Sequence, residues 1–228
     1  MGRLLIFFVL CCSLVGAELP KAARKVTKSR INQTSVPQHA RPLIILDAGH
    51  GGSNEGAQNN LVMEKRLTLS TTLYLKRYLE EAGYRVILTR NRDVFIPLPR
   101  RVAIANKTKA ALFVSVHYNA SHNHEVKGLE VFYYHGDDAR RTTASKQVAT
   151  SILSSMLHYT HAESRGVKAG NFHVIRETTM PAVLVEGGFI TNHEESTLLY
   201  DKKYLARIAK GIAQGVEKYF RTNVLGAS

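Results

Sequence analysis

The chain has 228 residues, with 31 lysines and arginines against 18 aspartates and glutamates, and its formal net charge is +13. This length is typical of one domain, and the 44% share of apolar residues excludes collagen-like and wholly disordered proteins. The charge predicts attraction to a polyanion, which could be nucleic acid, an anionic membrane surface or a charged wall polymer.

The first seventeen residues have the pattern of a secretory signal peptide. A short positive start is followed by an uncharged apolar run over residues 4–15, and small residues around Ala17 fit a cleavage site. The run is too short for a comfortable transmembrane helix, although an uncleaved anchor is the alternative. Both cysteines, Cys11 and Cys12, lie inside this segment. We therefore expect a cysteine-free mature protein that is exported across the inner membrane to the periplasm.

Residues 18–40 are predicted to form a flexible basic linker. Five lysines and arginines lie between residues 21 and 30, and no apolar period of a strand or helix is present. The segment could hold the protein against an anionic membrane or wall surface, and a solvated tail is the alternative. At the other end, residues 222–228 are expected to form a short tail, which leaves residues 41–221 as the folded domain.

Strand-like and helix-like segments alternate through this domain. Short apolar runs predict strands at residues 43–46, 85–89, 112–116, 129–134 and 182–185. Apolar residues at helical spacing predict helices at residues 67–82, 100–106, 144–158 and 205–219. Alternation of this kind is typical of the α/β class, so we predict a single domain with a mostly parallel central sheet and helices on both faces.

Polar side chains follow three of the predicted strands. His50 comes after the first strand, His117 after the third and Glu186 after the last, while Glu64 opens the first long helix. In open α/β sheets, sites form where the carboxyl ends of strands meet. Two imidazoles and one carboxylate form a catalytic zinc set that leaves a fourth position for water. On spacing alone this set is not specific, because 14 and 53 positions separate its members and no local motif brings them together.

Three further side chains are predicted to support such a site. Asp47 and Asn119 lie close to the two imidazoles in the sequence, and either could fix the tautomer of a ligand through a hydrogen bond. Arg176 precedes the last predicted strand and could bind a substrate carboxylate, with a surface ion pair as the alternative. Glu186 would remain as a general base.

Four motifs, in this order, resemble those of the zinc-dependent N-acetylmuramoyl-L-alanine amidases that split septal peptidoglycan. They are DAGHGG at 47–52, EK at 64–65, SVHYN at 115–119 and PAVLVEGGFITN at 181–192. The resemblance extends over residues 42–220. It implies Zn²⁺ held by His50, Glu64 and His117, with Glu186 as the catalytic carboxylate. The implied substrate is peptidoglycan, cut between N-acetylmuramic acid and the L-alanine of the stem peptide.

The same resemblance bears on regulation. Relatives that a partner holds inactive carry a long helical insertion that plugs the zinc. Here only a short polar connection joins the predicted strand at 129–134 to the predicted helix at 144–158. We therefore expect a monomer with an open site that needs no activator to uncover it.

Other classes of protein remain as alternatives. A zinc carboxypeptidase or deacetylase acting on another envelope substrate would have the same metal chemistry. A nucleic-acid-binding protein would fit the charge, but no such motif is present and export argues against it, so we expect no nucleic-acid partner. A serine-dependent, penicillin-sensitive activity is a further alternative, although the chain has no Ser-x-x-Lys motif.

Overall fold

The structure, a computed structural model, describes residues 41–223. Strands and helices follow one another along this part of the chain in near alternation. The strands are β1 (Leu43–Ala48), β2 (Arg85–Leu88), β3 (Leu112–Asn119), β4 (Leu129–Tyr133), β5 (Ser164–Ala169) and β6 (Ala182–Phe189). The helices are α1 (Glu64–Glu81), α2 (Leu98–Asn106), α3 (Ala139–Thr160), α4 (His173–Arg176), α5 (His193–Tyr200) and α6 (Lys202–Asn223).

Several predictions concern the two ends of the chain. The signal peptide at 1–17 and the basic linker at 18–40 lie outside the described residues. At the other end, α6 continues to Asn223, so the first two residues of the expected tail are helical. The remaining tail residues, 224–228, also lie outside the described part. Across residues 41–223, no helix combines the length and the apolar character needed to cross a membrane.

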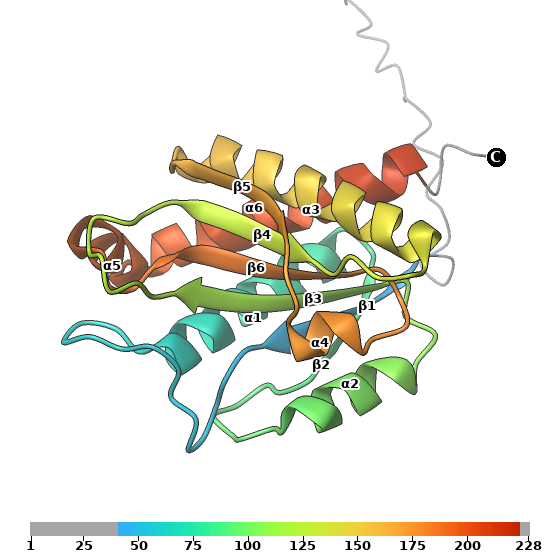
Figure 1. Ribbon diagram of the computed structural model, residues 1–228, viewed down its shortest axis with the longest axis horizontal. Helices are drawn as coiled ribbons and strands as arrows, with labels where there is room; N and C mark the ends of the chain where they lie inside the picture. The colour runs from blue at the N-terminus through green and yellow to red at the C-terminus, as the bar shows by residue number, and fades with distance from the viewer. Residues whose placement is uncertain (1–40, 224–228) are drawn as a thin grey trace, which may run out of the picture. The chain divides into compact units, whose positions relative to one another are not determined.

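The strands form one sheet in the order β2-β1-β3-β6-β4-β5. Pairing is parallel at β1–β2, β1–β3, β3–β6 and β4–β5, and it is antiparallel at β4–β6. The pair β4 and β5 therefore runs against the other four strands. The prediction of a mostly parallel central sheet is confirmed, and Figure 1 shows its strands lying side by side.

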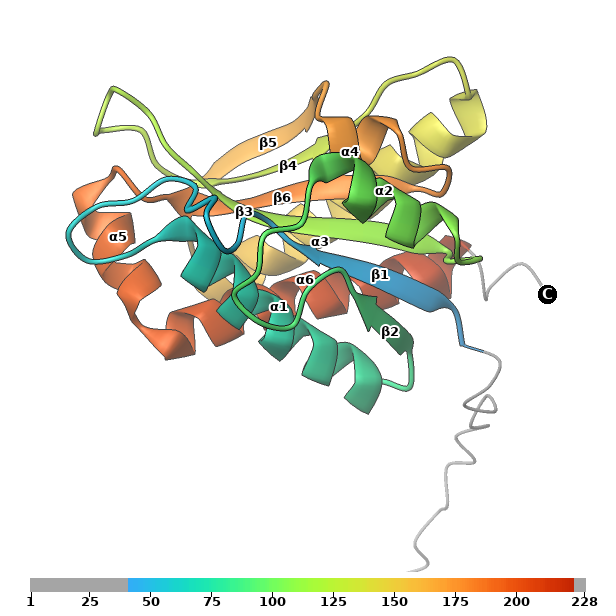
Figure 2. The same cartoon turned by 90° about the horizontal axis from the view of Figure 1, so that it is seen from below.

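Helices lie on both faces of the sheet, as predicted, but they cover the faces unequally (Figures 1 and 2). Helices α1, α3 and α6 pack on one face, over a large apolar cluster that includes Leu46, Val114 and Val185. Helices α2 and α4 lie on the other face, over a smaller cluster that includes Phe113 and Leu184. Since successive side chains of a strand point to opposite faces, β3 and β6 contribute to both clusters. The second face is only partly covered by helix.

The strands β1, β3 and β6 end at the same edge of the sheet. Their register pairs His117 of β3 with Glu186 of β6, and Glu186 with Glu130 of β4. Paired residues point to the same face of a sheet. These three side chains therefore form a row on the partly covered face, at the edge where the loop after β1 carries His50.

Three elements of the fold are not predicted by the sequence: β5, the four-residue helix α4, and α5. The sequence of β5, SRGVKA, has no regular alternation of apolar and polar residues, and its Gly166 has a φ of 89°. As an edge strand with exposed positions, it needs little apolar surface. Helix α5 is short and is capped by the preceding residue, Asn192, whose side chain accepts a hydrogen bond from the backbone N–H of Glu195.

Candidate active site

Two imidazoles and a carboxylate meet at the carboxyl edge of the sheet. His50 lies in the loop after β1, His117 near the end of β3 and Glu64 at the first residue of α1. Oε1 of Glu64 lies 3.0 Å from Nε2 of His50 and 3.0 Å from Nδ1 of His117. The potential ligand atoms of all three lie within 4.8 Å of one another. The structure thus brings together the three side chains that the sequence analysis puts forward as ligands.

Two glycines leave room for these side chains. A Cβ at Gly49 would lie 2.3 Å from Cε1 of His117, and one at Gly56 would lie 2.5 Å from Oε2 of Glu64. A side chain at either position would therefore displace a ligand. His50 itself has a φ of 60°, in the left-handed region that residues other than glycine rarely adopt. Such a conformation, held by its surroundings, is typical of functional sites.

The ring of His50 is oriented by an amide side chain. Nδ1 of His50 lies 2.8 Å from Oδ1 of Asn54, which also accepts the backbone N–H of Gly56 at 3.3 Å. An amide oxygen only accepts, so Nδ1 carries a proton and donates it. In the neutral ring, Nε2 then keeps its lone pair for a metal. Imidazoles that bind metals are commonly held in this way through their second nitrogen.

Glu64 is buried among donors. Its carboxylate accepts the backbone N–H groups of Ala57 at 2.9 Å and Tyr118 at 3.1 Å. Burial alone would raise the pKa of Glu64, but the hydrogen bonds and charges of His117 and His50 outweigh it and hold this pKa far below its usual range. Burial likewise opposes a charge on His50, and Glu64 outweighs it, so the pKa of His50 is raised. Glu64 is therefore ionised at neutral pH, which is the form that ligates metals.

Glu186 is a second carboxyl group at this edge, in the opposite environment. It is 8% exposed, and its Oε2 has no hydrogen-bond partner among the described residues. Burial raises the pKa of Glu186 well above its usual range, and the negative charges of Glu64 and Glu130 raise it further. A carboxyl group with an unpartnered oxygen and a raised pKa is suited to take up and release a proton during catalysis.

Asp47, predicted to fix the tautomer of an imidazole, instead holds Arg101. Oδ1 of Asp47 accepts hydrogen bonds from Nη1 of Arg101 at 2.7 Å and Oγ1 of Thr89 at 2.6 Å, while Oδ2 accepts from Oγ of Ser115 at 2.8 Å. Burial opposes ionisation, but the Arg101 charge and these hydrogen bonds outweigh it and lower the pKa of Asp47. Because these donors occupy its oxygens, Asp47 acts on the site through Arg101.

Arg101 ties this buried pair to the loop that carries His50. Its Nη2 donates to the backbone carbonyl of His50 at 2.6 Å, and its Nη1 donates to that of Ala48 at 2.6 Å. Both side chains of the Arg101–Asp47 pair are almost fully buried. Removing one partner of such a pair leaves an uncompensated charge, which costs about 3–5 kcal/mol. The pair therefore stabilises the backbone conformation of the ligand loop.

Asn119, also predicted to fix an imidazole, contacts a different acidic residue. Its Nδ2 donates to Oε1 of Glu130 at 2.8 Å. Two positions along a strand are separated by about 6.6 Å, so the side chain of Asn119 lies too far along β3 to hold the ring of His117. From the end of β3, the side chain of Asn119 therefore reaches across β6 toward β4.

Arg176, predicted to bind a substrate carboxylate, has its guanidinium bonded to neighbouring side chains. Its Nε donates to Oε1 of Glu177 at 2.6 Å and its Nη1 to Oδ1 of Asn171 at 2.6 Å. This arrangement corresponds to the alternative stated for Arg176, a surface ion pair. The carboxylate of Glu177 forms this ion pair because Glu177 directly follows Arg176, the last residue of the short helix α4.

Sequence reasoning missed three residues of the site, Asn54, Arg101 and Glu130. Asn54 lies in a glycine-rich loop, where asparagine often bonds to nearby groups, but its contact with His50 depends on a left-handed turn. Arg101 and Glu130 are charged residues within apolar segments, and a buried charge needs a partner. That rule could have marked both as buried ion-pair residues, although it would not have named their partners.

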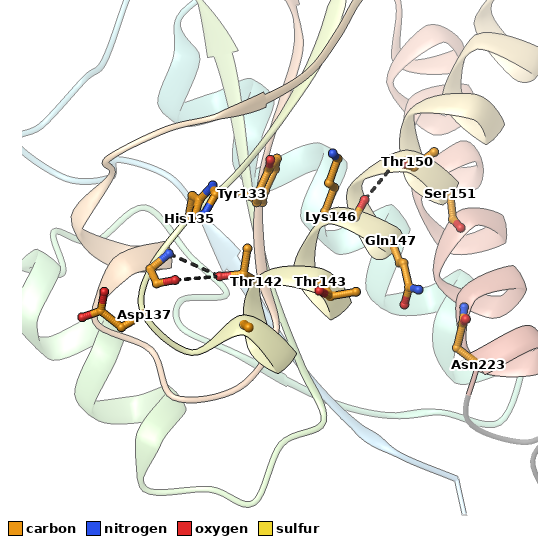
Figure 3. A pocket seen from close by; sticks show the side chains of 12 residues that line it. Tyr133, His135, Asp137, Thr142, Thr143, Lys146, Gln147, Thr150, Ser151 and Asn223 are labelled. Carbon is orange, nitrogen blue, oxygen red and sulfur yellow. Dashed lines mark hydrogen bonds between the residues drawn. The ribbon is translucent and has the colours of Figure 1, made fainter.

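A cavity of about 260 Å³ opens beside the two imidazoles. His50 and His117 line one side of it, and apolar side chains from the segment before α2, such as Phe95 and Ile96, line another. A larger hollow of about 870 Å³ lies near the start of α3 and the end of α6, and none of the predicted site residues lines it (Figure 3). Of these two cavities, the one at the imidazoles is where a bound substrate would lie next to the proposed ligands.

The donor set fits a zinc ion. Imidazole nitrogens and a carboxylate oxygen are ligands of catalytic zinc, and three protein ligands leave one position for solvent. Among residues 41–223, His50, Glu64 and His117 are the group of histidine and acidic side chains with the required spacing. The unpartnered, buried oxygen of Glu186 at the same edge also fits a site that is completed by another group.

Comparison with known proteins agrees with this arrangement. Residues 44–218 match the sequence model of the N-acetylmuramoyl-L-alanine amidase family. CwlM, an amidase of Bacillus licheniformis, is 38% identical over 179 residues, or 78% of this chain and 68% of CwlM. AmiC, an amidase of Neisseria meningitidis, is 30% identical over 259 aligned positions, which take in 93% of this chain. The alignment takes in 62% of AmiC, so this chain spans less than two thirds of that relative.

The fold is shared as well. The solved structure of an N-acetylmuramoyl-L-alanine amidase from Clostridium difficile 630 matches with a TM-score of 0.76 at 33% identity. The match includes 80% of this chain and 98% of that structure. By sequence over most of its length and by its fold, this chain belongs to the N-acetylmuramoyl-L-alanine amidase family of peptidoglycan hydrolases.

Proposed function

We propose that this amidase depends on zinc held by His50, Glu64 and His117, and that it serves wall remodelling and septum splitting. The main support for metal dependence is that the three potential ligand atoms lie within 4.8 Å of one another. Glu186 lies beside them with an unpartnered oxygen. The alternative of a zinc carboxypeptidase or deacetylase has the same metal chemistry, and the family match favours the amidase.

The ligand residues prepare the site for a difficult bond. An amide is a poor electrophile, so its hydrolysis needs both an activated nucleophile and a polarised carbonyl. When bound, zinc supplies a Lewis acid for both purposes. Glu64 is ionised because the two imidazoles lower its pKa, and Asn54 holds Nδ1 of His50 so that Nε2 is available. Arg101 fixes the backbone of the same loop through the carbonyl of His50.

Glu186 performs the proton transfers. Its Oε2 can accept a proton from the attacking water and deliver it to the nitrogen of the departing L-alanine. The second transfer is required because an amine leaves readily only after protonation. Burial keeps the pKa of Glu186 raised, so the protonated form persists long enough to act as the acid. One carboxyl group therefore serves both steps.

The exposure of the imidazoles supports an enzyme that needs no activator. The side chains of His50 and His117 are 22% and 18% exposed. Residues 134–138 alone join β4 to α3, which is too short a connection for a helical plug. We extend the proposal to a monomer whose site is open without a partner.

The location of the substrate and the first forty residues support an envelope enzyme. Peptidoglycan lies outside the inner membrane, and residues 1–17 have the pattern of an export signal. We therefore place the protein in the periplasm. The basic residues between 21 and 30 would then hold it against an anionic membrane or wall surface.

The purified protein, with no other protein added, is expected to release stem peptides from isolated peptidoglycan. Mass spectrometry with amino-terminal labelling identifies the cleaved bond, because the amidase reaction alone creates free L-alanine amino termini. Release of single carboxy-terminal amino acids would show a carboxypeptidase, and new amino groups on the sugars would show a deacetylase. Activity that begins only after an envelope partner is added would contradict the open site.

A further inference from the structure

The face of the sheet that carries Glu186 has no helix over β4, and side chains cover this strand instead. In Figure 1, the segment joining β5 to α4 crosses the near side of β4, and no helix lies in front of that strand. Phe172 of this segment packs edge-on against Phe132 of β4, with ring centroids 5.0 Å apart. Beside this segment, the groups over β4 that reach solvent are the side chains of Arg165 and Lys168 from β5.

These two cations are held by one buried carboxylate. Oε2 of Glu130 accepts hydrogen bonds from Nζ of Lys168 at 2.5 Å and from Nε of Arg165 at 3.2 Å. Its Oε1 accepts from Asn119. The side chain of Glu130 is 4% exposed, whereas those of Lys168 and Arg165 are 39% and 35% exposed. The buried carboxylate thus fixes two cations that face solvent.

The pair of cations retains binding capacity for an anion. One carboxylate balances only one of the two positive charges. An ammonium group has three donors and a guanidinium has five. The contacts with Glu130 use one donor from each, and a second Arg165 donor, Nη1, reaches the backbone carbonyl of Lys127 at 3.5 Å. The ring of Phe132 lies 5.9 Å from Nζ of Lys168 and provides an apolar floor. A carboxylate on a peptide matches this combination of charge and apolar surface.

The place of the cations in the sheet indicates which part of the substrate they meet. The proposed ligands lie on the side of β1 and β3, Glu186 lies on β6, and Lys168 lies two strands further on β5. The nitrogen of the departing peptide must lie near Glu186, since that residue protonates it. Strands are about 4.8 Å apart, so the backbone of β5 is about 10 Å beyond β6. The cationic groups lie nearer than that, because both bond to Glu130 on β4, the strand next to β6. Two extended residues span about 7 Å, which matches this shorter separation.

We propose that Lys168 and Arg165 form a subsite for a free carboxylate of the departing stem peptide, carried by the residue after L-alanine. Glu130 is the positioning residue that holds both cations. This inference rests on the proposed function, because it takes Glu186 as the group that protonates the leaving nitrogen. The subsite has the role that the sequence analysis predicts for Arg176, whose own guanidinium is bonded to Glu177 and Asn171.

Two synthetic muramyl tripeptides test the subsite. They differ only at the second residue, which is D-glutamate with a free α-carboxylate in one and its α-carboxamide in the other. The wild-type protein is expected to cleave the carboxylate form with a kcat/KM about tenfold higher, as a charge-assisted hydrogen bond would give. Lys168→Met is expected to lose most of this preference, and Lys168→Arg is expected to retain it.

Lys76 provides the matched control. Its Nζ pairs with one carboxylate, that of Glu80, and its side chain is 35% exposed, but it lies on the outer surface of α1. Lys76→Met should therefore keep the wild-type preference. If Lys168→Met loses its cooperative thermal unfolding, Arg165→Gln repeats the test with Lys168 still paired to Glu130.

The outcomes separate this inference from the proposed function. Equal cleavage of the two tripeptides by the wild type, or an unchanged preference in folded Lys168→Met and Arg165→Gln, would overturn the subsite alone. If the wild type releases no L-alanine terminus from either tripeptide or from isolated peptidoglycan, the proposed function itself fails.

Discussion

Glu186→Gln is expected to lose turnover while it keeps its metal. General acid–base catalysis contributes about 10²- to 10⁴-fold, and an amide side chain cannot take up or release the proton. We expect kcat for stem-peptide release to fall by that factor, with zinc content unchanged because Glu186 is not one of the proposed ligands. The two quantities are measured on one preparation, by product release and by elemental analysis.

Glu217 offers a matched control for this change. It is a glutamate on α6 whose pKa is also raised by burial, and it lies on the helix layer away from the cavity at His50. Glu217→Gln is expected to keep wild-type kcat. Wild-type release of stem peptides by Glu186→Gln would show that another group moves the proton.

The raised pKa of Glu186 also predicts a pH-dependent difference in stability in the metal-free protein. A carboxyl group with a folded pKa above its unfolded value stabilises the fold at low pH, and this contribution is lost as pH rises toward the folded pKa. Glutamine does not titrate, so metal-free Glu186→Gln should melt above the metal-free wild type at pH 8. The difference in melting temperature between the two proteins should be smaller at pH 5 than at pH 8. A larger difference at pH 5 would contradict the raised pKa of Glu186.

His117→Ala is expected to lose both zinc and turnover. Losing a hydrogen-bond partner of a ligand already weakens metal binding by about 10- to 100-fold, so losing the ligand itself should exceed about 100-fold. The variant also leaves Glu64 with one imidazole in place of two. Competition titration with a chromogenic chelator measures the affinity, and peptide release measures the activity.

His158 is the matched control for the loss of an imidazole. It is exposed in the last turn of α3 and does not line the cavity at His50. His158→Ala should bind zinc with wild-type affinity. If His117→Ala also keeps that affinity, the three-residue ligand set is wrong even though its atoms lie close together.

The two carboxyl groups of the site differ because of their surroundings. Both are buried, which by itself raises a pKa. Glu64 has two imidazoles and two backbone N–H groups around it, so it is ionised. Glu186 faces two other carboxylates, Glu64 and Glu130, so it favours the protonated form. This separation of pKa values assigns Glu64 to metal binding and Glu186 to proton transfer.

The buried strands could be predicted from the sequence, and their ends could not. Continuous apolar runs indicate β1, β3 and β6, because a strand covered on both faces has few polar positions. Yet β3 continues through His117 and β6 continues through Glu186, although the apolar runs stop earlier. The apolar pattern stops where the side chains become polar, but the backbone hydrogen bonds between β3 and β6 continue past that point. That continuation places His117 and Glu186 in register.

The contacts of the supporting residues could not be predicted, because they depend on segments far apart in the chain. Asp47 lies three positions from His50, which suggests a contact with the imidazole. In the structure, the oxygens of Asp47 instead accept hydrogen bonds from Arg101, 54 positions away, and from two hydroxyl groups. Lys168 was not predicted as a site residue, since β5 has no strand pattern of its own. Its partner Glu130 comes from the neighbouring strand.

The most direct test of a zinc site at His50, Glu64 and His117 is a metal titration of the chelator-treated wild type, followed by stem-peptide release. Without metal we expect no release. As zinc is added, activity should rise in proportion and level off at about one zinc per chain, the number that a single three-ligand site holds. Full activity in protein shown to be metal-free would contradict the account.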